Sequence, residues 1–231
     1  MEKQKGYFFL LQINDSLFPI GAYSHSYGLE TYIQKDLVHD TKTAQEYIKK
    51  KLGYNFLYTD LLAARMAYEA SIEQSLDRMD WLEEVIEASK IPMEIREASK
   101  KLGNRLVKTL LHMQIHDISS FFEQYLARRK GKTTAHPCVY GVICACVGIE
   151  KEQALANYLY AQASAMVTTC VKTIPLSQSD GQRILYSLDT FFEEILQQVQ
   201  QAGEEMLCLS TPGFDLRCIQ HEHLYSRLYM S

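Results

Sequence analysis

The sequence predicts an all-α fold, a single-domain helical bundle of about eight to ten helices that ends in a mobile C-terminal tail. Three observations support this prediction. The chain has 231 residues, of which 47% are hydrophobic and 23% charged, as in an ordinary globular protein with one core. Only five prolines and eleven glycines are present, too few for the many tight turns of a β-sandwich. Apolar residues recur every three or four positions over long stretches, which is typical of amphipathic helices.

The first unusual element is the opening segment, residues 11–30, where an apolar run gives way to a loop. Pro19 and Gly21 favour a specific bend, and an uncharged group of hydroxyls and rings follows at residues 23–27. Two interpretations stay open. The loop is either a polar turn in which Ser24 or Ser26 caps a helix, or a functional surface of the protein.

The next three helices follow from apolar spacing and from helix boundaries. A long helix is expected to begin at a capping box of Thr43 and Glu46 and to continue to about Met66. A second occupies residues 75–89, and Pro92 begins a third that continues to about residue 113. Arg96, Ser99 and Gly103 share one face of the third helix. We expect close packing of another segment at that glycine.

The second half of the chain predicts four more helices and a final segment. Asp117 or Ser119 begins a helix through Leu126, and residues 136–149 are small and apolar throughout, which favours a helix surrounded by others over a buried strand. Residues 151–173 keep helical spacing, and a seam from about residue 179 to residue 199 predicts one further helix. After a linker from residue 203, residues 215–231 either dock on the body or stay mobile until a partner binds.

Composition excludes several classes of function. A net charge of −4 and a pI near 6.0 give no basic footprint for nucleic acid. The six scattered cysteines are typical of reduced core residues, and we therefore expect a cytoplasmic protein. The N-terminal residues do not resemble a signal peptide, and the longest uncharged apolar run, residues 139–149, is shorter than the ~20 residues that cross a bilayer. No membrane association is expected.

Residues that are typical of catalysis or of metal binding are sparse. P-loop, G-x-G-x-x-G, G-x-S-x-G and H-E-x-x-H patterns are absent, so we assign no catalytic, cofactor-binding or metal-binding residues. His112 and His116 are four residues apart and would face one metal ion if a helix continued there. We interpret them as an incidental surface pair, with a helical metal-dependent enzyme as the alternative. His221 and His223 diverge on a helix because they are two residues apart.

Several separate motifs carry a family resemblance over nearly the whole chain. Residues 15–30, DSLFPIGAYSHSYGLE, resemble the N-terminal signature of the urease accessory protein UreF family. The later motifs are an R-x-x-S-x-x-x-G element, a His-Pro segment, a Pro-Leu-x-Gln element with a following Gly-Gln, and an HE-x-LYSRL ending, at Arg96–Gly103, His136–Gly141, Pro175–Gln182 and His221–Leu228. The chain departs from the pattern at Ser177, where glycine is common, and at Tyr229-Met230, where Phe-Arg is common.

The resemblance implies one UreF-like all-α domain over residues 1–231, with an N-terminal arm (1–7) and a C-terminal linker and docking tail (203–231). It implies a maturation chaperone without an active site, which as a homodimer bridges UreD (also called UreH) and the GTPase UreG for GTP-dependent nickel insertion into apo-urease. Regulation of another GTPase is a further alternative. The residues that the resemblance implies for partner binding are Pro19, Gly21, Tyr23, Ser24, Ser26, Gly28, Glu30, Arg96, His221, Glu222, Tyr225, Arg227 and Leu228.

Overall fold

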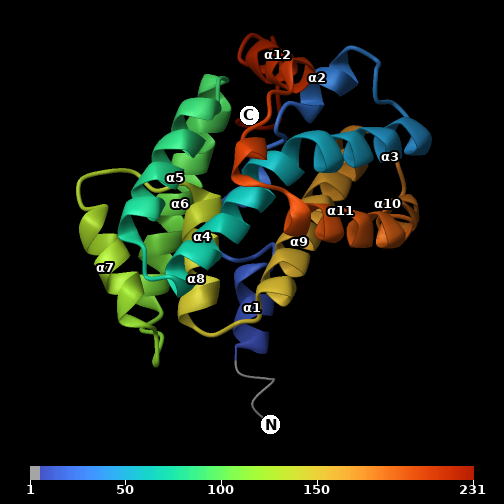
Figure 1. Ribbon diagram of the computed structural model, residues 1–231. Coiled ribbons are helices and arrows are strands. Elements are labelled where there is room, and N and C mark those ends of the chain that lie inside the picture. The colour runs from blue at the N-terminus through green and yellow to red at the C-terminus, as the bar shows by residue number, and fades with distance from the viewer. Residues whose placement is uncertain (1–5) are drawn as a thin grey trace.

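A computed structural model describes residues 6–231, and within that range the chain is helical with no β-strand (Figure 1). The α-helices are α1 (Tyr7–Ile13), α2 (Leu29–Gln34), α3 (Thr41–Lys50), α4 (Leu62–Ile72), α5 (Leu76–Ser89), α6 (Met93–His112), α7 (Ser120–Arg128), α8 (His136–Cys146), α9 (Lys151–Thr173), α10 (Gln178–Tyr186), α11 (Asp189–Gln201) and α12 (Pro212–His221). Two short 3₁₀ helices, η2 (Ala22–Ser24) and η4 (Glu204–Met206), are also present. The remaining helical element is the π-helix η3 (Lys51–Leu61). Most of the expected N-terminal arm, residues 1–5, lies outside the described range.

The segments α3, η3 and α4 form one continuous helix from residue 41 to residue 72. Counted in this way, the described residues contain eleven α-helices, slightly more than predicted. The expected long helix is therefore present, but its middle, η3, has the wider π-helical winding. Such winding is rare and often marks a functional region of a helix. The capping box lies slightly earlier than predicted: Asp40 accepts from the Thr43 backbone, and the Thr43 side chain completes the pair.

Helix α8 lies at the centre of the bundle beside α4 (Figure 1). Nearly all its residues are buried, which confirms a helix where a buried strand was the competing prediction. The contact is close because Gly141 has no side chain. A Cβ atom there would lie 2.2 Å from the carbonyl oxygen of Ala64 and 2.9 Å from the Ala67 Cβ. The two backbones thus approach to a distance that no other residue permits without rearrangement.

Other predicted helices are confirmed, and several boundaries are corrected. Ser75 and Ser119 cap α5 and α7, and α9 occupies residues 151–173 as expected. The predicted single helix from residue 179 to residue 199 is wrong: α10 and α11 are separate, and α10 is capped by Ser177. The chain turns at Ser187, and Leu188, the N-cap of α11, is fully buried directly after the turn.

The opening segment lacks the serine N-cap that one of its two interpretations required. Neither Ser24 nor Ser26 caps a helix. Gly21 and Gly28 occupy the N-cap positions of η2 and α2 with φ of 85° each, in the left-handed region that glycine adopts most easily. The loop therefore depends on the backbone freedom of its glycines, while its serine hydroxyls are engaged elsewhere.

The C-terminal tail, which was expected to be mobile, is docked on the body of the protein. Helix α12 packs on α2 and α6, and the residues after it return to the opening segment (Figure 1). Of the two outcomes that the sequence left open for residues 215–231, the structure has the docked one. No helix within residues 6–231 is both long and apolar enough to cross a membrane.

Candidate interaction surface and internal cavity

The opening segment and the tail form one unit through backbone hydrogen bonds. The backbone N–H groups of Ser26 and Tyr27 both donate to the backbone oxygen of Ser231, at 2.5 and 3.0 Å, and the Ser26 hydroxyl donates to the same oxygen at 2.7 Å. The Met230 N–H donates to the Ser24 carbonyl at 2.8 Å. Tyr27 itself has a left-handed backbone conformation, with φ of 52°. Two segments about 200 residues apart in the chain thus share one anchor.

Two signature glycines have separate structural roles at this unit. A Cβ atom on Gly28 would lie 2.7 Å from Cys218 Sγ, so that glycine allows α12 to approach α2. Gly21 has open space around it, so a side chain would meet no neighbour there. Its positive φ would nevertheless make any other residue strained at this position. The Ser24 hydroxyl donates to the Gly21 carbonyl at 2.7 Å, which closes the turn.

An ionic cluster centred on the buried His221 lies beneath these hydrogen bonds between the opening segment and the tail. His221 is fully buried between two carboxylates, with Nε2 3.1 Å from Glu30 Oε2 and Nδ1 2.7 Å from Glu94 Oε2. Each nitrogen of the His221 ring thus faces a carboxylate oxygen. Arg227 pairs with the other oxygen of Glu94 at 2.5 Å. Glu30 also accepts from the Leu228 N–H at 2.7 Å. We call the cluster and the Ser26–Ser231 anchor together the tail junction.

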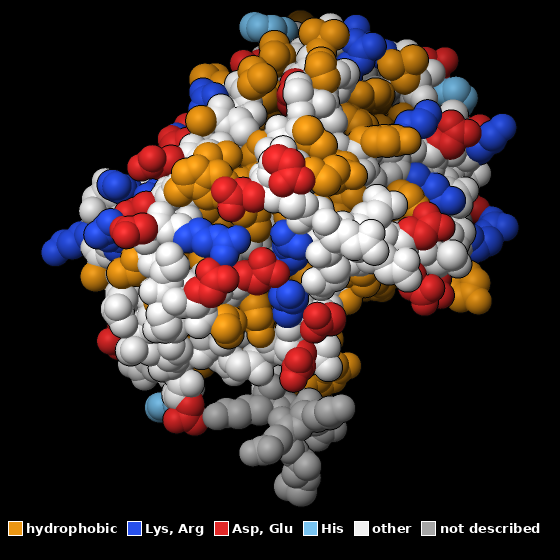
Figure 2. Space-filling model, viewed as in Figure 1, with side chains coloured by type: hydrophobic (Ala, Val, Ile, Leu, Met, Phe, Trp, Pro, Cys, Tyr) orange, Lys and Arg blue, Asp and Glu red, His pale blue; other side chains and the backbone are white. Residues whose placement is uncertain are grey.

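Around the tail junction, apolar and aromatic side chains of the tail and the opening segment face solvent. Tyr23 is 70% exposed, Leu228 is 77% exposed, and the Tyr225 side chain is fully exposed. In the view of Figure 2, apolar side chains gather in the upper part of the molecule, where α2 and α12 lie in Figure 1. Exposed large side chains of this kind, fixed on an ordered base, are typical of a protein interaction surface.

The other predicted partner-binding residues are divided between this surface and the interior. Pro19 is exposed, and its carbonyl accepts from Arg105 Nε at 3.1 Å. Glu222 is half-buried at the end of α12. Arg96 lies elsewhere: it donates to the Lys90 and Ile91 carbonyls and holds the turn between α5 and α6.

The face of α6 that carries Ser99 and Gly103 packs closely against another segment, as predicted. A Cβ atom on Gly103 would lie 2.1 Å from the Thr134 carbonyl oxygen. This glycine therefore admits the chain that leads into α8. Ser99 is buried on the same helix, and its hydroxyl has no hydrogen-bond partner among the described residues.

The histidine pair does not form the helical arrangement that a shared metal ion would need. Helix α6 ends at His112, and Gln114, with φ of 49°, turns the chain before His116. Within residues 6–231, no group of three or more histidine, cysteine or acidic side chains is arranged to hold a metal ion. The i, i+4 relation that motivated the alternative of a metal-dependent enzyme is therefore absent.

Sequence reasoning missed two members of the tail junction, Glu94 and Ser231. Glu94 lies in the first turn of α6 and approaches His221 only because α12 packs on α6. Arg96, two positions further along, belongs to a sequence motif but contacts the α5–α6 turn. No local pattern distinguishes Glu94 from the other exposed-looking carboxylates of that helix, so only the tertiary structure identifies it.

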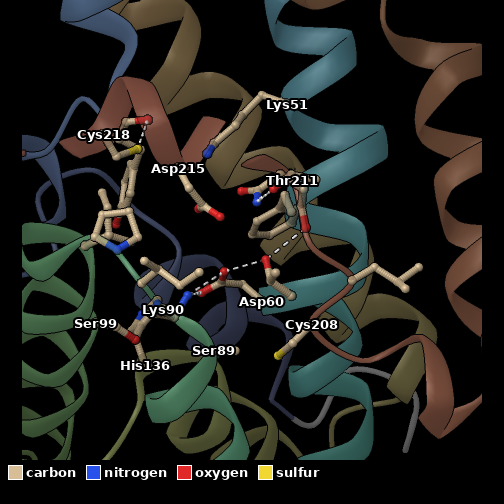
Figure 3. A pocket seen from close by; sticks show the side chains of 18 of the residues that line it. Lys51, Asp60, Ser89, Lys90, Ser99, His136, Cys208, Thr211, Asp215 and Cys218 are labelled. Carbon is tan, nitrogen blue, oxygen red and sulfur yellow. Dashed lines mark hydrogen bonds and ion pairs between the residues drawn. The ribbon is translucent and has the colours of Figure 1, made fainter. Parts of the chain in front are cut away.

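A separate cavity of about 280 Å³ lies inside the molecule, between η3, the α5–α6 turn and the segment from Cys208 to Cys218 (Figure 3). Lys90 Nζ pairs with Asp60 at 2.9 Å on its wall. His136 lies beside this pair, with Nδ1 3.1 Å from the Tyr158 hydroxyl. Burial lowers the pKa of His136 to about 4, so the ring is neutral near pH 7.

The fold, the surface around the tail junction and the internal cavity indicate the general class of protein, and the comparisons with known proteins then give the family. Residues 6–231 form an all-helical protein with an ordered, partly apolar surface at the tail, and no group of histidine, cysteine or acidic side chains among them is arranged to hold a metal ion. The sequence model of the UreF family matches residues 38–189. The urease accessory protein UreF of Actinobacillus pleuropneumoniae serotype 5b is 36% identical over 222 residues, which cover 96% of this chain and 97% of that protein. UreF of Haemophilus influenzae strain Rd is also 36% identical, over 96% of this chain and 94% of its own length. The chain belongs to the UreF family of urease accessory proteins, and its role lies in urease maturation.

Proposed function

We propose that this protein is a non-catalytic maturation scaffold that bridges UreD (UreH) and the GTPase UreG for GTP-dependent nickel insertion into apo-urease. Membership of the UreF family supports the urease-related part of the proposal. The observation that carries the scaffold part is the exposed surface around the tail junction, where Tyr23, Tyr225 and Leu228 face solvent on an ordered base. A homodimer in the cytoplasm is part of the same proposal.

Other residues of the predicted set support this surface from below. The buried Glu30 and His221, with the more exposed Arg227, belong to the cluster that fixes the tail, and Ser26 anchors its last residue. We infer that they position the tail and that the exposed side chains contact UreD. Aromatic residues are favoured as anchors at the centre of an interface because they bury a large area at little cost in conformational entropy.

The experiment is co-purification of tagged protein with UreD and UreG from cells that express all three. We expect capture of both partners by the natural chain, and a loss of UreD capture in the Tyr225→Ala and Leu228→Asp variants. Truncation of a central interface anchor typically costs about 2 kcal/mol or more, which corresponds to roughly thirtyfold in affinity. Both side chains are exposed, so neither substitution disturbs the core.

Tyr186 provides a matched control, because it is also largely exposed but belongs to α10, away from the tail. Tyr186→Ala should capture UreD as the natural chain does. Failure of the natural chain to co-purify with either UreD or UreG would exclude the bridging role. Equal capture of UreD by the natural chain and all three variants would show that UreD binds another surface.

A further inference from the structure

The internal cavity has its own chemistry, which the interaction surface does not use. The π-wound segment η3 supplies one wall, the α5–α6 turn a second, and the chain from Cys208 to Cys218 a third (Figure 3). Its volume of about 280 Å³ is close to the lower end of the range of small-molecule sites. The Cys208 N–H donates to the Tyr58 carbonyl of η3 at 2.7 Å, which fixes the third wall against the first.

Lys51 is the unusual residue of this cavity. Its side chain is on the first turn of η3 and points inward (Figure 3), and the residue is only 7% exposed. Within residues 6–231 its ammonium makes no hydrogen bond and no ion pair within 4.0 Å, and Nζ lies 4.7 Å from the centroid of the Phe214 ring. Burial lowers the pKa of Lys51. A buried ammonium without a paired anion is costly, and a bound anion would offset that cost.

The acidic groups nearby do not pair with this lysine. Asp60 is already neutralised by Lys90, which donates to both of its carboxylate oxygens. Asp215 also lines the cavity and attracts Lys51 without a direct ion pair, and burial raises the pKa of its carboxyl group. The Lys51 ammonium therefore remains available to a ligand.

Two further hydrogen-bond donors line the cavity without a partner among the described residues. They are the hydroxyl of Ser99, which is buried, and the phenol of Tyr27. Free donors in this cavity favour a ligand with acceptor atoms, and within residues 6–231 no group of histidine, cysteine or acidic side chains is arranged to hold a metal ion there. Between the polar groups, Phe56, Ile95 and Leu102 offer apolar surface.

We propose that this cavity binds a small organic monocarboxylate, with its carboxylate on the Lys51 ammonium and its apolar part against Phe56, Ile95 and Leu102. One unpaired ammonium matches one negative charge, which favours a monoanion over a phosphate dianion. Tyr27 and Ser99 supply the additional donors that a carboxylate accepts. This site does not use the exposed side chains of the proposed partner surface, and isolated protein suffices to test it.

The test compares three probes of nearly the same shape that differ in charge: benzoate, benzamide and benzylamine. Titration calorimetry and thermal unfolding of the full chain should show benzoate binding, with a rise in Tm that grows with benzoate concentration. Benzamide should bind at least about tenfold more weakly because it cannot form the charged hydrogen bond. Benzylamine should not bind. Equal binding of benzoate and benzamide, or no benzoate binding by the folded protein at millimolar concentration, would overturn the proposal.

Variants then assign the contact to Lys51. Lys51→Met should lose benzoate binding by about tenfold or more and keep its fold, because methionine fills the same space without the buried charge. Lys49→Met is the matched control: Lys49 also lies over an aromatic ring, that of Phe191 at 5.7 Å, but it does not line the cavity. Tyr27→Phe and Ser99→Ala remove single donors, keep nearly the natural shape, and should each weaken benzoate severalfold. Unchanged affinity in all three cavity variants contradicts the site.

Discussion

The α4–α8 contact and the tail junction both join segments that are far apart in the chain, yet opposite kinds of interaction hold them together. At the first, small residues bring two backbones together, with Gly141 against Ala64 and Ala67. At the second, charged and polar groups meet: His221 lies between two carboxylates, and Ser26 anchors Ser231. Apolar packing depends on volume, whereas a buried ionic cluster depends on every member having a partner.

This difference predicts how each region responds to a substitution. The α4–α8 contact is part of the one hydrophobic core, so a change there acts on the whole domain. The tail junction is fixed at its edge by a few hydrogen bonds and ion pairs, so it can open while the core stays folded. A segment of this kind is suited to rearrange on contact with a partner.

Substitution of Gly141 should have the largest effect. In Gly141→Ala the new methyl group meets the Ala64 carbonyl at about 2.2 Å, so the helices must separate. We expect the free energy of unfolding to fall by about 3 kcal/mol, measured by urea denaturation. Gly213→Ala, where nothing lies within 4 Å, should change it by less than about 0.5 kcal/mol. A tolerated Gly141→Ala would mean that the core is less tightly packed than its geometry indicates.

Loss of His221 should open the tail without unfolding the core. His221→Ala leaves Glu30 and Glu94 facing each other without the ring between them, at a local cost of about 2–3 kcal/mol. Hydrogen exchange should accelerate in residues 222–231 and in the opening segment, while α4 and α8 stay protected. His223 is exposed and serves as the control. Uniform acceleration across the chain would show that the two regions are not separable.

The buried carboxyl group of Glu83 should make the stability of the core depend on pH. Glu83 accepts from the Tyr125 hydroxyl and from the Ala135 N–H, and burial raises its pKa from 4.5 to about 7. The folded state therefore binds more protons than the unfolded state between these values, so stability is full below about pH 4.5 and falls as pH rises toward 7.

Glu83→Gln keeps the neutral form at every pH and should flatten that part of the stability profile. The expected difference is on the order of 2–3 kcal/mol between pH 5 and pH 7, from denaturation curves across the range. Glu84, its neighbour, provides the control substitution. An unchanged slope in Glu83→Gln would exclude Glu83 as its source.

The smallest effect is expected at the anchor of the tail. Ser26→Ala removes the hydroxyl that donates to the Ser231 oxygen but keeps both backbone hydrogen bonds. The cost should be about 1 kcal/mol and confined to the tail, visible as faster proteolysis after residue 221 at nearly constant Tm. Ser16→Ala, at an exposed site, should have no such effect. A global loss of stability would place Ser26 with the core instead.

Most of the fold was predictable because apolar periodicity reports burial directly. The stripe of α9, with Leu155, Leu159 and Ala163, is buried as its spacing indicated. The break between α10 and α11 was not predictable, because the seam continues through the turn and only the burial of Leu188 reveals it. The π-helical winding of η3 was missed for a similar reason, since its residues also suit an ordinary helix.

The site was predicted unevenly. Motifs identified Glu30, His221 and Arg227, which do meet in space, but they also included Arg96, which holds a distant turn. Glu94 and the inward-facing Lys51 carry no local signal, because a charged residue on a helix is ordinarily solvated. Both became visible only when the packing of several elements showed what surrounds them.

By itself the sequence determined the helical class, the central position of residues 136–146 and the UreF motifs, because each of these is encoded in neighbouring residues. Tertiary structure alone decided that the tail is docked, that His221 lies between Glu30 and Glu94, and that Lys51 faces a cavity. These features join segments that are far apart in the chain. Their energies come from contacts and from exclusion of water, neither of which exists until the helices pack.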